Sequence, residues 1–340
     1  MLDLSIYENG QNCKPETVTG TGEILEDLTA TGKKRPWNER KRESLTMLEL
    51  FKRARKYDSD VISDSRLLAL SDCASWLEFA EAADRARKLA RANFCRIRLC
   101  PMCAWRRSLK LFSQVSAITD AILAEKKARF IFVTLTIQNV AGQDLRDAIA
   151  RMNDGFKILT QKSKDYAISA GLRKNLLGYM RAVEVTYNSR RDDFHPHIHC
   201  IFEVRPSYFN EKGNYLTHAD WKAMWQSVMK LDYEPQVCVK AIKGSKRDIA
   251  EVAKYPVKVD GLLKVKDKEK AAKALVYLKW GIHNCRMVTF GGDFREYKKR
   301  LALDDVESGD LVHVEADAKE LNAVAMTLFR YRADVGAYIC

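Results

Sequence analysis

The chain has 340 residues, 46% of them hydrophobic, which is enough for about two domains with sizeable cores. Lys and Arg number 58 against 45 Asp and Glu, and this formal net charge of +13 favours a polyanionic partner such as nucleic acid. No run approaches about 18 apolar residues and no apolar segment opens the chain, so we expect a cytoplasmic protein without a membrane span or signal peptide.

The first third of the chain predicts a tail followed by helices. Residues 1–36 are rich in Gly, Thr, Glu and Asn without periodicity, which predicts a flexible tail. Residues 37–127 are expected to form a helical module. Its predicted helices are 37–57, the run LEFAEAADRARKLARANF within 60–94, and 108–127.

Strands and helices alternate in the next part, residues 128–300. Strands are predicted at 129–138, 177–187, 194–204 and 236–242, and helices at 144–166, 221–230, 248–255 and 270–281. This order predicts an α+β domain with an antiparallel sheet. The polar turn NSRRDD between the second and third strands predicts a hairpin, and residues 301–340 are expected to be a C-terminal appendage.

Three cysteines within nine residues have the spacing of a metal site. Cys95, Cys100 and Cys103 stand as C-x4-C-x2-C, and Cys73 is the best candidate for the fourth ligand of a structural zinc ion. Buried free thiols and redox chemistry remain alternatives. Arg106 and Arg107 follow directly, where we expect them to meet phosphate or simply to begin a solvated helix.

Histidine is scarce, with six in the chain, yet His195, His197 and His199 alternate in the run FHPHIHCIFEV. Side chains alternate between the faces of a strand, so the three imidazoles are expected to share one face. Such a cluster on a rigid strand can hold a divalent ion, although a merely polar strand face is the alternative.

A further candidate site lies in DIAEVAKYPVK. Glu251 and Tyr255 are one helical turn apart, and Lys254 and Lys258 flank the tyrosine as candidate DNA contacts. A tyrosine oxygen can attack phosphorus when a metal polarises the phosphate, and a nearby carboxylate can activate water. The pair alone is weakly specific, because such pairs are usually structural.

Several segments occur in an order that resembles one known family. These are CRIRLCPMCAWRRS, VTLTIQN, GYMRAVEVTYN, HPHIHCIF, EVAKYPVK and RMVTFGGDFRE. Over about residues 70–300 the chain resembles rolling-circle plasmid replication initiators of the HUH endonuclease superfamily, in particular a cysteine-rich family with a single catalytic tyrosine.

The resemblance implies a fold and a chemistry. The fold would be an HUH-type nicking and joining core with a central antiparallel sheet flanked by helices, preceded by the helical zinc-binding module. His197 and His199 would hold Mg2+ or Mn2+, with Glu184 or its rival His195 as third ligand. Tyr255 would be the nucleophile and Glu251 would serve in termination.

The same resemblance implies partners and leaves alternatives. The partner would be plasmid origin DNA, single-stranded at the nick site, with a host helicase and polymerase, and the protein would be able to act as a dimer. An HUH relaxase or transposase would share the chemistry, but the tyrosine follows the histidines and has no second tyrosine one turn away. A non-catalytic zinc-ribbon DNA-binding protein and a zinc hydrolase are the remaining alternatives.

Overall fold

The computed structural model describes residues 17–18, 22–29, 31–83, 86–161, 170–211, 213–242, 259–314 and 323–340. The chain divides into two compact units. Unit 1 comprises Met1–Arg42, Ala74–Asn93 and Asp317–Cys340, and unit 2 comprises Glu43–Cys73 and Phe94–Ala316. Each unit therefore contains segments that lie far apart in the sequence.

Unit 2 is built on an antiparallel five-stranded sheet. Its strands, in the order β7-β4-β6-β5-β8, are Val237–Ile242, Arg129–Thr136, Asp193–Val204, Leu176–Asn188 and Val288–Gly292. The inner strands β4 and β6 are rich in aromatic and β-branched residues, which suit a pleated and largely buried position. The predicted hairpin of the second and third strands is therefore present as β5 and β6.

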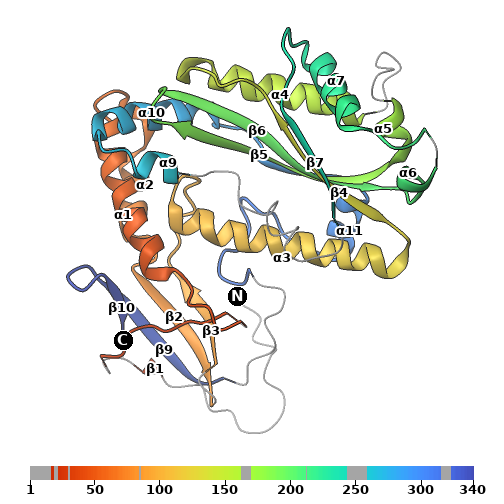
Figure 1. Cartoon of the computed structure of the whole chain (residues 1–340). Coiled ribbons are helices and arrows are strands. Elements are labelled where there is room, and N and C mark those ends of the chain that lie inside the picture. The colour runs from red at the N-terminus through yellow and green to blue at the C-terminus, as the bar shows by residue number, and fades with distance from the viewer. Residues whose placement is uncertain are drawn as a thin grey trace. The chain divides into compact units, whose positions relative to one another are not determined.

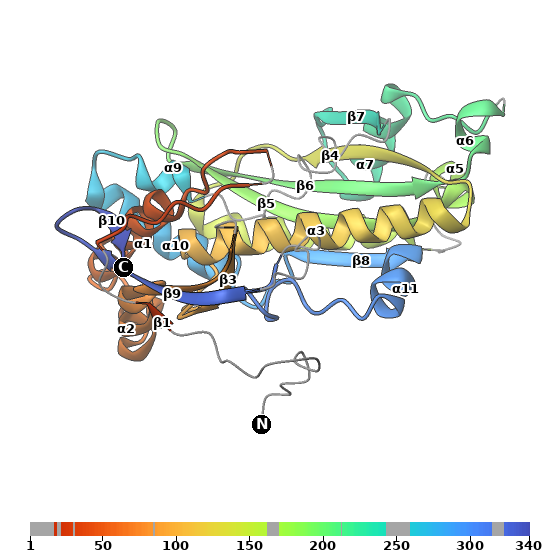
Figure 2. The same ribbon diagram turned by 90° about the horizontal axis from the view of Figure 1, so that it is seen from below.

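Helices cover both faces of this sheet (Figures 1 and 2). Helix α3 (Pro101–Glu125) lies across one face, and α4 (Leu145–Thr160) and α7 (His218–Met229) lie on the other. Phe202 of β6 faces α4 and α7, since its ring stacks on those of Phe156 and Trp221 with centroids 6.0 and 5.7 Å apart. Its neighbour Glu203 points to the other face, where Lys126 after α3 pairs with its carboxylate at 2.6 Å. The odd-numbered residues of β6 thus share the α3 face.

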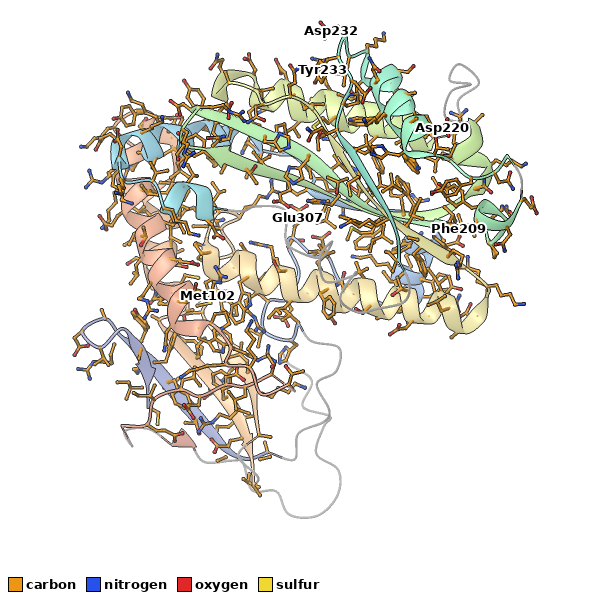
Figure 3. All side chains as sticks on the ribbon, in the orientation of Figure 1. Met102, Phe209, Asp220, Asp232, Tyr233 and Glu307 are labelled. Atoms are coloured by element: carbon orange, nitrogen blue, oxygen red, sulfur yellow. The ribbon has the colours of Figure 1, made fainter. Side chains whose placement is uncertain are left out.

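Apart from α10, the other helices that lie wholly in unit 2 are shorter than α3, α4 and α7. They are α2 (Asp64–Asp72), α5 (Ala170–Asn175), α6 (Ser207–Asn210), α9 (Asp260–Leu263), α10 (Lys268–Gly281) and α11 (Asp293–Arg300), with 3-10 turns η1 (Ser59–Val61) and η2 (Gly142–Asp144). Helix α1 (Trp37–Ala54) begins in unit 1 and ends in unit 2. Glu307 lies in the segment after α11 and is labelled in Figure 3. Its carboxylate accepts hydrogen bonds from the main-chain N–H groups of Met287 and Val288, where β8 begins.

Unit 1 is a smaller sheet. Its strands are β1 (Thr17–Val18), β2 (Trp76–Ala82), β3 (Arg87–Ala92), β9 (Ala323–Arg332) and β10 (Ala337–Ile339). Strand β9 lies between β1 and β2, β3 pairs with the other edge of β2, and β10 also pairs with β9. Only the two-residue β1 runs parallel to its neighbour.

The helix expected within 60–94 is wrong over residues 76–82 and 87–92, which form the paired strands β2 and β3. Leu77 and Phe79 are both fully buried, and Phe79 packs edge-on against Phe329 of β9 with ring centroids 5.9 Å apart. The local preference of Ala, Glu, Arg and Lys for helix is therefore overridden by pairing with a strand from the other end of the chain.

The predicted α+β class is confirmed, because two largely antiparallel sheets are combined with helices. The predicted boundaries differ from the two units. Part of the expected tail 1–36 has defined structure, since Asp27 is buried and accepts a hydrogen bond from Trp37 at 2.7 Å. The helical module 37–127 and the appendage 301–340 are each shared between both units. The helix expected at 248–255 lies outside the described residues.

Candidate functional site

Strands β5 and β6 bring one carboxylate and two imidazoles together on the α3 face of the sheet. Glu184 lies directly opposite His197, and the small residue Ala182 lies opposite His199. The Glu184 Oε2 atom is 3.0 Å from His199 Nε2 and 3.5 Å from His197 Nε2. One ligand atom from each of these three residues lies within 4.8 Å of the other two.

Neighbouring groups orient both imidazoles. The Nδ1 atom of His197 is 3.3 Å from the main-chain carbonyl of His195, which can only accept, so His197 donates from Nδ1 and turns Nε2 toward Glu184. The Nδ1 atom of His199 is 3.1 Å from Thr134 Oγ1, and the ring stacks on Phe132. Such contacts fix the ring of a ligating histidine and direct its free nitrogen to a metal.

His195 shares the face but does not join the cluster. Its ring centroid is 5.3 Å from that of His197, while its Nδ1 atom is 2.9 Å from Asn139 Oδ1. Burial, the neighbouring His197 and Arg191 lower the pKa of His195, so the neutral ring is favoured. Of the two candidates for third ligand, Glu184 has the geometry and His195 does not.

The donor set fits a divalent cation. Two imidazole nitrogens and one carboxylate oxygen, with Glu184 only 1% exposed at its side chain, are ligands used for Mg2+, Mn2+ and other divalent ions. Three protein ligands leave coordination positions for a substrate. The arrangement can therefore hold a divalent cation that keeps open coordination positions.

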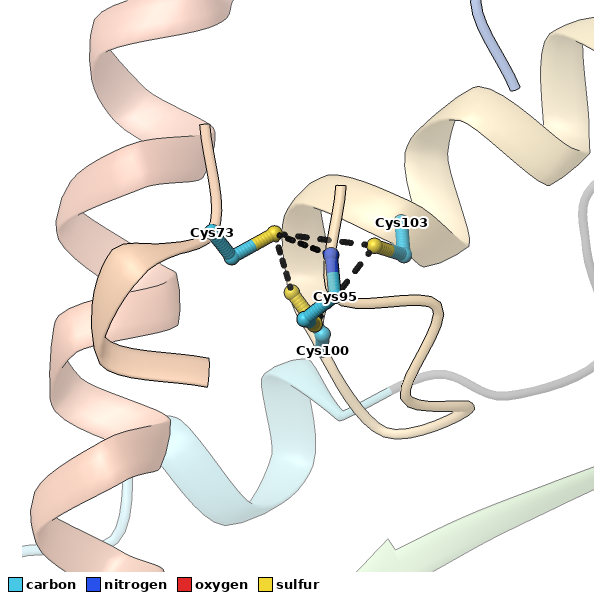
Figure 4. Close-up of side chains that lie close together, drawn as sticks. All are labelled: Cys73, Cys95, Cys100 and Cys103. Carbon is cyan, nitrogen blue, oxygen red and sulfur yellow. Dashed lines mark hydrogen bonds between the residues drawn. The ribbon is translucent and has the colours of Figure 1, made fainter. Parts of the chain in front are cut away.

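A second cluster consists of four buried thiols (Figure 4). Cys73 follows α2, Cys95 lies in the loop before α3, Cys100 is the N-cap of α3, and Cys103 lies in its first turn. Pro101 at the first position of α3 is suited to a helix start. The four predicted zinc ligands are therefore together, and Figure 4 shows their sulfur atoms converging on one point.

The sulfur separations match a tetrahedral metal site. The Sγ atom of Cys73 is 3.6 Å from those of Cys100 and Cys103, and Cys95 Sγ is 3.7 Å from Cys103 Sγ. Zinc–sulfur bonds of about 2.3 Å in a tetrahedron place the sulfurs about 3.8 Å apart. Burial alone would raise the pKa of Cys100, but hydrogen bonds from the other thiols and Ser44 outweigh it and lower that pKa well below its ordinary value.

Arg106 and Arg107 do not lie where we expected them. Both are buried, at 3% and 2% exposure. Arg106 donates to the main-chain carbonyls of Leu311 and Val312 at 2.9 and 2.7 Å. Arg107 donates to the carbonyls of Arg96, Ile97 and Glu307. The expectation that these two arginines meet phosphate is corrected, since their donors hold two loops to α3.

Tyr255, Glu251, Lys254 and Lys258 lie outside the described residues. The chain resumes at Val259, which is buried, and α9 follows at Asp260. Within α9, Gly261 lies so close to β5 that a Cβ on it would be 2.9 Å from the Tyr187 carbonyl oxygen. Helix α9, which follows the Tyr255 segment in the sequence, thus lies beside β5, the strand that carries Glu184.

The sequence patterns did not single out Thr134 and Asn139 individually. Both belong to VTLTIQN, one of the segments on which the family resemblance depends. Their positions within that segment carry no sign of contact with the histidines. Only the pairing of Thr134 with His199 and the bridge between Val140 and Phe194 place them there.

Among the described helices, none has the length and apolar character needed to cross a membrane.

Comparison with known proteins identifies the family. A family described as "Replication protein" matches residues 86–339. "Protein rep" of Streptococcus pneumoniae serotype 2 is 38% identical over 88% of this chain and 90% of its own length. "Protein rep" of Bacillus amyloliquefaciens is 35% identical over 91% of this chain and 94% of its own, and that of Lactiplantibacillus plantarum is 36% identical over 86% and 90%. No solved structure matches. Since the family match spans most of the chain, the protein belongs to the replication protein family.

Proposed function

We propose that this replication protein initiates rolling-circle replication of a plasmid. It would bind the double-strand origin, nick one strand by attack of Tyr255 and join that strand again at termination. The observation that carries this proposal is the cluster of Glu184, His197 and His199 on one face of the sheet. A non-catalytic DNA-binding protein would have no use for such a site.

Chain connectivity supports Tyr255 as the nucleophile. Tyr187, which contacts Gly261, is three residues from Glu184 along β5, or about 10 Å. Six residues separate Tyr255 from Gly261, and a chain of that length spans at most about 21 Å. A tether of this length would allow the tyrosine to reach the candidate metal ligands.

The chemistry assigns one role to each residue. A divalent cation bound by Glu184, His197 and His199 would neutralise charge on the scissile phosphate and polarise it. Tyr255 Oη would form a bond to phosphorus as the bond to the 3′ oxygen breaks, and the phenolic proton would leave as a 3′-hydroxyl forms. Lys254 and Lys258 would hold flanking phosphates.

The products explain the later steps. The freed 3′-hydroxyl would prime a host polymerase, while a host helicase separates the strands. After one round, Glu251 would accept a proton from the water that attacks the regenerated site. A hydrolytic ending accounts for the use of one tyrosine.

We further propose that Cys73, Cys95, Cys100 and Cys103 hold a structural zinc ion. The support is the tetrahedral spacing of the four sulfurs and their burial, which closes the site to substrates. Because all four ligands belong to unit 2, the ion would stabilise the unit that carries the candidate catalytic centre.

The test uses Tyr255→Phe with single-stranded oligonucleotides spanning the nick site of the plasmid that encodes the protein. Wild-type protein with Mn2+ is expected to give an SDS-stable protein–DNA adduct, and the variant is expected to bind the origin but form none. Tyr215→Phe is the matched control, since Tyr215 is 55% exposed and belongs to a different segment. An adduct that persists in Tyr255→Phe would contradict the assignment.

A further inference from the structure

A chain of hydrogen-bonded side chains lies next to the metal ligands. Arg191 Nε is 3.0 Å from Asp193 Oδ2, and Asp193 Oδ1 accepts a hydrogen bond from Asn139 Nδ2 at 2.7 Å. Asn139 Oδ1 is in turn 2.9 Å from His195 Nδ1. Two main-chain hydrogen bonds of 2.8 Å between Val140 and Phe194 hold the segment of Asn139 against the start of β6.

The acceptors in this chain determine where its protons lie. The Asp193 carboxylate can only accept, so the amide of Asn139 must turn its NH2 group to Asp193 and its carbonyl oxygen to His195. That oxygen also can only accept, so His195 donates from Nδ1 and keeps a lone pair on Nε2.

The same residue acts on His197 through its main chain. The carbonyl of His195 is the acceptor for His197 Nδ1, so His197 Nε2 is turned toward Glu184 Oε2 at 3.5 Å. Asn139 therefore fixes the side chain of His195, and the main-chain carbonyl of His195, which β5 pairing also holds, orients the ring of the candidate ligand His197.

We propose that Asn139, held by Asp193, is a positioning residue of the metal centre. It keeps His195 in the Nδ1–H tautomer, so His195 Nε2 is a hydrogen-bond acceptor beside the His197 ring. This acceptor can bind a water molecule of a hydrated divalent cation. This inference rests on the proposed function of the site, but its first test needs neither DNA nor catalysis.

The test compares Asn139→Ala with the double exchange Asn139→Asp plus Asp193→Asn in the full chain. Alanine removes the acceptor from His195. In the exchange, the new carboxylate at position 139 can accept from both His195 Nδ1 and the new amide at position 193, so the chain is rebuilt with its charge moved to the other partner. Gln138→Ala is the control, because this neighbouring side chain is exposed.

The tautomer of His195 is read from the nitrogen chemical shifts of 15N-histidine-labelled protein without metal. We expect the Nδ1–H form in the wild type, the control and the exchange, and a mixture of both tautomers in Asn139→Ala. Mn2+ affinity, measured by titration without DNA, is expected to fall about 10- to 100-fold in Asn139→Ala and to recover in the exchange.

Nicking assays then separate this inference from the proposed function. In Asn139→Ala the Mn2+ concentration for half-maximal rate should rise more than the rate at saturating Mn2+ falls. An Nδ1–H tautomer or wild-type Mn2+ affinity in folded Asn139→Ala would overturn the inference, as would failure of the folded exchange variant to recover. Absence of a Tyr255 adduct in the wild type would instead overturn the proposed function, with the tautomer result unaffected.

Discussion

Glu184 faces His197 across the β5–β6 pair, and a single oxygen of its carboxylate lies within 3.5 Å of both His197 Nε2 and His199 Nε2. Replacing Glu184 by Gln keeps the shape of the side chain but removes the negative charge. We expect Mn2+ affinity to fall at least about 10-fold, since even residues that only orient metal ligands cost this much. Titration of metal-free protein with Mn2+ measures the effect.

Asp154→Asn is the matched control for this change. Asp154 is an exposed carboxylate on α4, which covers the opposite face of the sheet. If Glu184→Gln binds Mn2+ as tightly as this control does, Glu184 is not a ligand.

The four-thiol cluster gives a prediction on metal content and stability. Cys103→Ser should leave the purified protein without its equivalent of zinc and lower the free energy of unfolding by more than about 3 kcal/mol. Cys238→Ser should change neither, because Cys238 is exposed and outside the cluster. Elemental analysis and thermal unfolding provide the measurements. A full zinc complement in Cys103→Ser would exclude the site.

The burial of Arg107 predicts a stability defect in place of a DNA-binding defect. Arg107→Ala leaves three main-chain carbonyls without this donor, and we expect a loss of about 3 kcal/mol or more. Below the unfolding temperature, the slope of log affinity for origin DNA against log salt concentration should be unchanged. Arg295→Ala, with a side chain 63% exposed, should stay within about 0.5 kcal/mol of the wild type. A shallower slope of log affinity against log salt concentration for Arg107→Ala would instead support a contact between Arg107 and a DNA phosphate.

Gly261 predicts a link between packing and catalysis. In Gly261→Ala the new Cβ would lie 2.9 Å from the Tyr187 carbonyl oxygen, so α9 must shift, at about 1–3 kcal/mol. Because α9 follows the Tyr255 segment, we expect slower adduct formation with unchanged Mn2+ affinity. Gly171→Ala is the control, since its Cβ would make an ordinary 3.4 Å contact with Leu216. Equal rates of adduct formation in Gly261→Ala and Gly171→Ala would argue against a role of α9 in holding the Tyr255 segment.

A surface ion pair predicts a pH dependence. Hydrogen bonds from Arg300 and Tyr297 lower the pKa of Glu125 to about 2 from its ordinary 4.5. A carboxyl with a lowered folded pKa stabilises the fold above its ordinary pKa, and the contribution disappears as the pH falls toward the folded pKa. Glu125→Gln should therefore unfold at a slightly lower temperature than the wild type above about pH 5, with the difference vanishing near pH 2. A difference that grows on acidification would contradict this sign.

The sequence was sufficient to predict the central sheet and the residues that form its candidate metal site. Strands β4, β5 and β6 are rich in aromatic and β-branched residues, and the short turn between β5 and β6 fixes which residues oppose each other. That is why the sequence alone could place Glu184 across from the histidines.

Other features depend on contacts that no local pattern encodes. Residues 76–92 favour helix by composition, and they form strands only because β9 from the C-terminal end pairs with β2. Arg106 and Arg107 have the sequence of a solvated helix start, but residues 307–312 cover them. In both cases the deciding partner lies about 200 residues or more away, beyond the reach of periodicity.

Two cysteines of the four-thiol cluster flank the β2–β3 hairpin in the sequence. Cys73 directly precedes residues 74–93 and Cys95 follows them after one residue, and the amide of Ala74 donates to the Asn93 carbonyl at 2.8 Å where the two ends of the hairpin meet. The two ends of the hairpin are thus held at a fixed distance from each other, whatever the length or surface of the hairpin between them. A corresponding hairpin from a relative could be transplanted between these cysteines if it keeps the residues that pair with β9, and the register of β5 and β6 would not have to change.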